Sequence, residues 1–261
     1  MSPNSFKQQV IITDVELARF HRDGYLVVKG LAEPDVLHSM NEIVDNCLDP
    51  AMAPVEFEVD VHYPGAPADR SAIGGHTPRR LLHALSRHPN FLHWAGHVDV
   101  VDILRRLLAS DNLDVSQNHH NCIMTKYPGY SSVTNWHQDI RYWSFDRPEL
   151  ISVWLALGPE YEKNGGLRII PGSHKIELER GRLDATLFLR TDIEENFELI
   201  DSAINLELDS GDTLFFHCRT FHAAGRNQTE AVKRSLVFTY RASDNEPIPE
   251  TRSANFVDLK V

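Results

Sequence analysis

Residues 151–157 read ISVWLAL, an almost unbroken apolar run between Pro148 and Gly158. The run is shorter than an ordinary helix and contains branched and aromatic residues, and turn-forming residues stand on both sides of it. These features predict a β-strand. Other segments of the chain predict strands by the same criteria.

Three further segments have the composition that is typical of strands. Residues 167–170 precede a Pro-Gly turn, and residues 213–216 and 235–241 are rich in aromatic and branched side chains. Several short strands separated by turns, after a helical N-terminal part, are typical of a sandwich or jelly roll flanked by helices. The predicted fold class is therefore mainly β with flanking helices (α+β).

The N-terminal part begins with signals for a short helix and a strand. Thr13 and Glu16 have the spacing of a capping box, and Gly24 can end the helix that they begin. Residues 25–28 form a compact β-type run. Residues 36–48 then place apolar side chains at a spacing of 3.6 residues, which predicts a helix that packs on a sheet.

The remainder of the N-terminal part predicts a second helix and a long loop. Apolar residues recur every three or four positions over residues 91–108, whereas residues 49–80 contain several Pro and Gly residues without a clear period. No internal repeat or Ser/Gly linker marks a boundary. We expect a single domain over residues 1–261, with a helical part at 1–112 and a jelly-roll core at about 113–245.

Composition restricts the classes of partner. The chain has 261 residues, 42% of them hydrophobic, and a formal net charge of -11. Because a negative protein repels polyanions, we expect no nucleic acid and no anionic membrane surface as partner, and instead a small-molecule substrate. The three cysteines are widely spaced and form no CxxC pair, which indicates a reducing compartment. The first ten residues contain no apolar leader and no segment reaches a membrane span, so a cytoplasmic location is expected.

A metal site is suggested by residues 135–139, which read NWHQD. Two histidines and one carboxylate can hold iron and leave positions open, and residues i and i+2 of a strand point to the same side. Three places in the chain match His-x-Asp: His21 with Asp23, His97 with Asp99, and His137 with Asp139. The first two pairs lie in helical patterns, where i and i+2 diverge. Only the third lies in β-like sequence.

The third ligand should come from a distant strand. Residues 211–216 form a turn that enters a buried strand, and His217 and His222 follow it. His222 is favoured because the small residues after it, Ala223 and Ala224, leave room for a metal and a co-substrate. On these grounds alone His217 stays open as the alternative.

Arg234 is a candidate for binding an anion. It begins the strand after His222 and alternates with Leu236 and Phe238, so it is expected to share their inward face. An arginine keeps its charge when buried and offers a planar two-pronged contact to a carboxylate. The alternative is an ordinary salt bridge at the end of a strand.

Together these motifs resemble the phytanoyl-CoA dioxygenase family, which includes phytanoyl-CoA and ectoine hydroxylases. The resemblance covers residues 113–241 and the opening at 20–28. Its motifs are NWHQD at 135–139, NGGL at 164–167, IPGSH at 170–174, GD at 211–212, HAAGRN at 222–227, and Arg234.

The resemblance implies a double-stranded β-helix (jelly roll, cupin-like) that uses Fe(II), 2-oxoglutarate and O2, with ascorbate as a stimulant. It assigns the iron ligands to His137, Asp139 and His222, which selects His222 over His217. It assigns Arg234 to the distal carboxylate of 2-oxoglutarate. Trp154, Gln138 and Lys126 match further positions of the co-substrate pocket, and His174 matches a structural position.

The implied reaction is the hydroxylation of an aliphatic C–H bond in a small-molecule or acyl substrate, with release of succinate and CO2. Related halogenases carry a small residue where this chain has Asp139, so hydroxylation is favoured. Two alternatives are a metal-binding jelly roll without oxygenase activity and a zinc-dependent hydrolase.

The segments expected to shape the substrate pocket are residues 56–80, the aromatic residues Tyr142, Trp143 and Phe145, residues 175–203, and Arg141.

Overall fold

The computed structural model describes residues 10–261, and two antiparallel sheets form its centre. The larger sheet has the order β1-β10-β7-β12-β5-β3-β2, with β4 beside β12 and β13 beside β4. Its strands are β1 (Tyr25–Val28), β2 (Val55–Phe57), β3 (Pro78–Leu82), β4 (Leu113–Val115), β5 (Asn121–Lys126), β7 (Leu150–Ala156), β10 (Thr213–His217), β12 (Lys233–Ala242) and β13 (Leu259–Lys260). The smaller sheet, in the order β6-β11-β8-β9, consists of β6 (Thr134–His137), β11 (His222–Ala224), β8 (Leu167–Ile169) and β9 (Ile204–Asn205).

The two sheets pack face to face over an apolar layer. Trp154, Leu214 and Val237 from the larger sheet form one buried cluster with Leu167 and Ile169 from the smaller sheet. Because side chains alternate across a strand, the neighbours of these residues point to the opposite face of the larger sheet.

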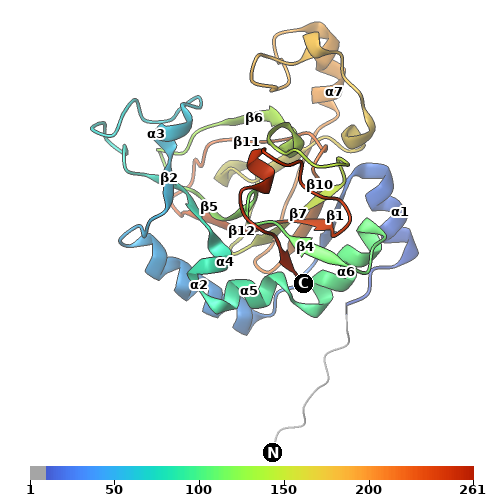
Figure 1. Cartoon of the computed structure of the whole chain (residues 1–261). Coiled ribbons are helices and arrows are strands. Elements are labelled where there is room, and N and C mark those ends of the chain that lie inside the picture. The colour runs from blue at the N-terminus through green and yellow to red at the C-terminus, as the bar shows by residue number, and fades with distance from the viewer. Residues whose placement is uncertain (1–9) are drawn as a thin grey trace, which may run out of the picture.

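That opposite face carries the helices. Leu236, Phe238 and Tyr240 of β12 lie in a second, larger cluster with residues of the helices. Figure 1 shows α2 (Pro34–Leu48), α5 (Pro89–Ala95) and α6 (Val98–Leu108) along this side of the sheet. The remaining helices are α1 (Asp14–Asp23), α3 (Glu58–Val61), α4 (Ala84–Arg87) and α7 (Phe197–Asp201). The jelly-roll fold and the flanking helices are thereby as predicted.

Two predictions for the N-terminal part were wrong in detail. Residues 49–80 are not only a loop, because they contain β2, α3 and the beginning of β3, which add to the edge of the larger sheet. Residues 91–108 are not one helix, because α5 ends at Ala95 with Gly96 as its C-cap, and His97 caps α6 by accepting a hydrogen bond from the Asp99 backbone N–H. Pairing with β5 overrides the Pro- and Gly-rich composition that suggested a loop.

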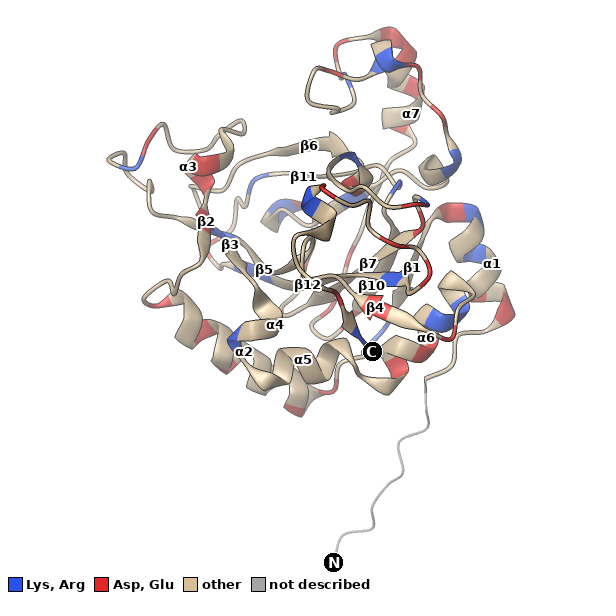
Figure 2. Ribbon diagram, viewed as in Figure 1, with Lys and Arg blue, Asp and Glu red and all other residues tan. Residues whose placement is uncertain are grey.

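Figure 2 shows acidic residues along α2, α3 and α7, of which Glu58 on α3 is buried. Cys47, Cys122 and Cys218 are buried free thiols. Within residues 10–261, no helix combines the length and the apolarity that crossing a membrane requires. The expectation about an apolar leader falls almost entirely on residues 1–9, outside the described part.

Candidate metal and co-substrate site

The two sheets bring three predicted ligands together. His137 is the last residue of β6 and His222 the first of β11, and the two residues are direct partners in the antiparallel register. Asp139 follows β6 in a short turn of 3-10 helix, Asp139–Tyr142. The pairing of β6 with β11 therefore joins ligands that are remote in sequence.

The donor atoms of this triad face one another. His137 Nε2 lies 3.9 Å and His222 Nε2 3.6 Å from Asp139 Oδ1, and the ring centroids of the two histidines are 4.2 Å apart. Among the described residues this is the one group of three or more potential ligands found close together, with all donor atoms within 4.8 Å of one another.

Backbone carbonyls fix the orientation of both imidazoles. His137 Nδ1 lies 2.9 Å from the carbonyl oxygen of Asn135, and His222 Nδ1 lies 3.0 Å from that of Thr220. A carbonyl only accepts, so Nδ1 carries the proton and Nε2 keeps its lone pair for a metal. Burial also lowers the pKa of His137 well below its usual value, which keeps this imidazole neutral.

The carboxylate of Asp139 is also held on the side away from the two ligand imidazoles, His137 and His222. Ser152 on β7 donates a hydrogen bond of 3.0 Å to Asp139 Oδ2, and His120 Nδ1 lies 3.5 Å from the same oxygen. Burial raises the pKa of Asp139, but His120, His222 and His137 together outweigh burial and leave the pKa below its usual value. Asp139 is therefore an ionised ligand with one oxygen facing the imidazoles.

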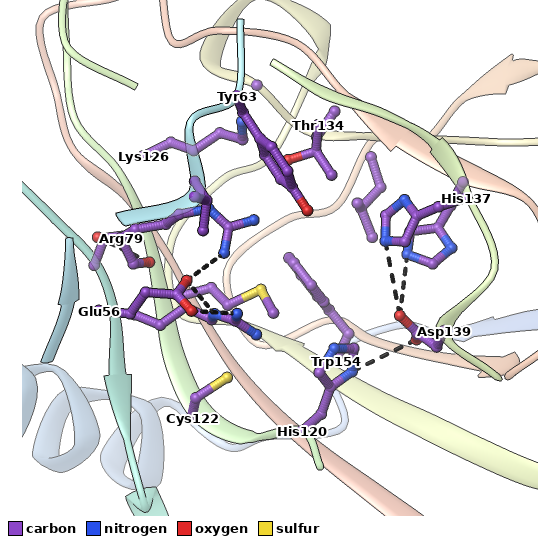
Figure 3. Close-up of a pocket in the computed structure, with 18 of the residues that line it drawn as sticks. Glu56, Tyr63, Arg79, His120, Cys122, Lys126, Thr134, His137, Asp139 and Trp154 are labelled. Carbon is purple, nitrogen blue, oxygen red and sulfur yellow. Dashed lines mark hydrogen bonds and ion pairs between the residues drawn. The ribbon is translucent and has the colours of Figure 1, made fainter. Parts of the chain in front are cut away.

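A cavity of about 430 Å³ opens beside the triad. Its lining includes His137, Asp139 and His222, and also Lys126 and Trp154, two of the predicted co-substrate residues. Figure 3 shows Lys126 and Trp154 on different sides of the space in front of His137 and Asp139.

Lys233, which was not singled out from the sequence, also lines this cavity and stands opposite Lys126 in the pairing of β12 with β5. Its Nζ lies 2.9 Å from Glu160 Oε2, and the same carboxylate accepts hydrogen bonds from Trp154 Nε1 (2.9 Å) and Ser235 Oγ (2.6 Å). Burial, and next the cation of Lys233, lower the pKa of Lys126 to about 7. Both lysines thus line the cavity. Lys233 pairs with a carboxylate, whereas the Lys126 ammonium group donates to the backbone carbonyl of Ser132 at 2.8 Å.

The structure corrects the predicted position of Arg234. Its Nη1 lies 2.6 Å from Asp45 Oδ1 on α2, and Arg234 is not among the residues that line the cavity. It does share a face with Leu236 and Phe238, as predicted, but this is the face that packs under the helices. Lys233, on the opposite face, points where Arg234 was expected.

Other candidates lie outside the cavity lining. Gln138 donates from its amide nitrogen to the carbonyl of Arg219. His217 accepts from the Arg219 backbone N–H at 3.1 Å and has its ring centroid 5.3 Å from that of His174, so these two histidines contact each other rather than the triad. His21 lies within α1, and His97 caps α6.

The segments expected to shape the substrate pocket contribute unequally. Residues 56–80 supply Glu56, Tyr63, Arg79 and Arg80 to the cavity lining, and Tyr142 and Trp143 line it as well. Phe145, Arg141 and residues 175–203 do not line it. Phe188 nevertheless packs against the rings of Tyr63 and His137, with ring centroids 5.6 and 5.7 Å apart. The Arg141 guanidinium lies 3.6 Å from the centre of the Phe188 ring. The 175–203 segment thus supports the pocket from outside.

The donor set fits iron. Two neutral imidazole nitrogens and one carboxylate, with a cavity on the open side, are the arrangement that suits a non-haem Fe(II) oxygenase. Among the described residues the group contains no cysteine, whereas tetrahedral structural zinc sites commonly contain cysteine ligands.

The family model for phytanoyl-CoA dioxygenase (PhyH) matches residues 20–235. The chain belongs to the phytanoyl-CoA dioxygenase family. A probable phytanoyl-CoA dioxygenase of Caenorhabditis elegans is 23% identical over 244 residues, which cover 89% of this chain and 77% of that protein. An ectoine dioxygenase of Streptomyces coelicolor is 26% identical over 251 residues, which cover 89% of this chain and 79% of that protein.

Solved structures share the fold. EctD from S. alaskensis with bound Fe matches with a TM-score of 0.76 and 20% identity, over 96% of this chain and 87% of that chain. The same protein with 2-oxoglutarate and 5-hydroxyectoine matches with a TM-score of 0.76 and 20% identity, over 94% of this chain and 84% of that chain. The predicted family, its jelly-roll fold and its reaction class, an Fe(II)- and 2-oxoglutarate-dependent dioxygenase, are confirmed.

Proposed function

We propose that this family member hydroxylates an aliphatic C–H bond of a small molecule, using Fe(II), 2-oxoglutarate and O2 and releasing succinate and CO2. The observation that carries the proposal is the convergence of His137 Nε2, His222 Nε2 and Asp139 Oδ1 beside a cavity. The relatives named for ectoine support a small-molecule substrate. Asp139 supports hydroxylation, because the carboxylate that halogenases lack is present and buried.

In this proposal O2 is the oxidant, bound iron and 2-oxoglutarate would activate it, with 2-oxoglutarate as the co-reductant, and the protein supplies positions. His137, Asp139 and His222 hold the iron. Lys126 and Lys233 bind the distal carboxylate of 2-oxoglutarate, because both line the cavity and stand opposite each other in the pairing of β5 with β12. Trp154 packs beside Lys233, whose Nζ lies 4.9 Å from the centre of the ring, and gives the co-substrate an apolar wall.

The neighbours of Lys233 hold its ammonium group in one orientation. Glu160 holds the ammonium group through an ion pair and also fixes Trp154 and Ser235. A mobile lysine would lose rotamer entropy on binding, and Glu160 removes most of that cost in advance. A metal-binding module or a zinc hydrolase has no use for such a pair of buried lysines, which favours the oxygenase over both alternatives.

Conversion of labelled 2-oxoglutarate tests the proposal without knowledge of the substrate. Purified protein with Fe(II) and ascorbate is expected to form succinate slowly in the absence of substrate. His137→Ala should abolish this reaction, whereas His93→Ala, which removes an exposed histidine from α5, should leave it unchanged. Wild-type protein that forms no succinate, or His137→Ala protein that forms as much as wild type, would contradict the proposal.

A further inference from the structure

The wall of the cavity that lies across from the triad carries a second group of charges. Arg79 and Arg80 on β3 both contact Glu56 on β2. Figure 3 shows Arg79 beside Glu56, across the space from His137 and Asp139. Arg79 Nη1 donates to Glu56 Oε1 at 2.7 Å, and Arg80 donates to Oε1 from Nε at 2.7 Å and to Oε2 from Nη2 at 2.6 Å. All three residues line the cavity.

This group has one positive charge in excess. Burial raises the pKa of Glu56, but Arg80 and then Arg79 reverse the effect and leave the pKa below its usual value, so Glu56 is ionised. Two guanidinium groups therefore share one carboxylate. Arg80 forms the fork-to-fork pair with both oxygens, which leaves Arg79 with a single hydrogen bond to Glu56 and further N–H groups to offer.

Neighbouring acids are engaged elsewhere. Glu58, which also lines the cavity, accepts hydrogen bonds from the backbone N–H and the hydroxyl of Ser132 at 3.2 and 2.6 Å. Glu160 is paired with Lys233. The side chains of Arg79 and Arg80 are only 14% and 25% exposed, so water screens the excess charge poorly. A ligand with one negative charge would compensate it.

Uncharged residues form much of the remaining cavity lining, which also includes one further cation, Arg252. Tyr63, Leu82, Cys122 and Trp143 contribute apolar and aromatic surface. His119 lines the same space, and burial lowers its pKa to about 3, so it adds no charge. A ligand that fits here has an anionic end at Arg79 and Arg80 and an apolar body directed toward the triad.

We propose that the substrate is an apolar carboxylic acid whose carboxylate binds Arg79 and Arg80 and whose chain presents a C–H bond to the metal site. This inference rests on the proposed hydroxylase function and specifies its substrate class. The carboxylate is free rather than a coenzyme A thioester, because coenzyme A needs several cations on an open groove for its phosphates. Here the cations lie inside the cavity and are half neutralised by Glu56.

Octanoate and octanamide test this proposal as a matched pair. Equilibrium dissociation constants are measured by calorimetry, without oxygen, on protein loaded with Fe(II) and saturating 2-oxoglutarate. Octanoate is expected to bind at least about tenfold more tightly than octanamide, because it alone forms an ion pair with the arginines. Octanoyl-CoA should bind more weakly than octanoate.

Arg79→Gln provides the second arm. It should weaken octanoate binding about tenfold and leave octanamide binding unchanged, and the latter shows that the cavity is intact. Arg22→Gln, the same change at a side chain that is 68% exposed and paired with Asp23, is the control and should change neither constant.

Equal binding of octanoate and octanamide to the wild-type protein would overturn the inference, as would octanoyl-CoA binding at least as tightly as octanoate. Unchanged octanoate binding by Arg79→Gln would also overturn it. These failures are separable from a failure of the proposed function: protein that converts 2-oxoglutarate to succinate but does not distinguish octanoate from octanamide loses only the carboxylate assignment.

Discussion

At the scale of single residues, the two oxygens of Asp139 have different neighbours. Oδ1 faces the imidazoles of His137 and His222, whereas Oδ2 lies beside Ser152 and His120. A carboxylate held in this way keeps one oxygen directed at the metal. Groups that orient a metal ligand commonly change metal affinity by about 10- to 100-fold when they are removed.

Ser152→Ala should therefore weaken Fe(II) binding by about tenfold, because Asp139 loses its one hydroxyl donor. Anaerobic equilibrium dialysis measures the effect directly, independent of catalysis. Ser202→Ala, in an exposed turn after α7, serves as the matched control. Equal iron affinity in Ser152→Ala and the wild type would show that Ser152 does not position Asp139.

If Lys126 binds 2-oxoglutarate as proposed, co-substrate binding should depend on pH. Its pKa is lowered to about 7 by burial and by Lys233, and only its protonated form attracts a carboxylate. Below this pKa the cation is present, and it is lost as the pH rises. The KM for 2-oxoglutarate should therefore increase above about pH 7, by at most about tenfold per pH unit.

Lys126→Arg separates this effect from other titrations, because arginine stays protonated throughout the range. Its KM for 2-oxoglutarate should change less with pH than that of the wild type. Parallel pH profiles of the two proteins would exclude Lys126 as the titrating group.

At the scale of elements, the alternation along β12 decides which cation reaches the cavity. Arg234→Ala should leave the KM for 2-oxoglutarate within about twofold of the wild type and cost at most about 1 kcal/mol of stability, because its partner Asp45 is 59% exposed. Lys233→Ala should raise that KM by about tenfold or more, since a charge-assisted contact is lost and Glu160 is left unpaired. Steady-state kinetics on both variants make the comparison. The reverse order of effects would restore Arg234 as the anchor.

The same strand shows what sequence reasoning could and could not reach. The alternation of Arg234 with Leu236 and Phe238 was read correctly, but a two-layer fold has two apolar faces, and the pattern alone does not say which one meets the cavity. The pairing supplies the answer. Trp154 lines the cavity and stands opposite Val237, and Lys233 lies four residues from Val237 along β12, on the same face.

At the scale of the molecule, the jelly roll itself was predictable because short apolar strands and their turns are local signals. The triad was also accessible, since a His-x-Asp pair in β-like sequence and a later histidine have a recognisable order. Glu160, Ser152 and His120 carry no such signal. Their roles follow from which strands become neighbours, as does the contribution of β2 and β3 from a segment that resembled a loop.

Iron binding by two matched histidine variants tests the central claim most directly. Anaerobic titration should give one Fe(II) per chain in the wild type. His222→Gln should weaken binding by about 100-fold or more, on the order of 3 kcal/mol, whereas His217→Gln should retain it because His217 contacts His174 outside the triad. Unaltered iron binding by His222→Gln, or its loss in His217→Gln alone, would contradict the account.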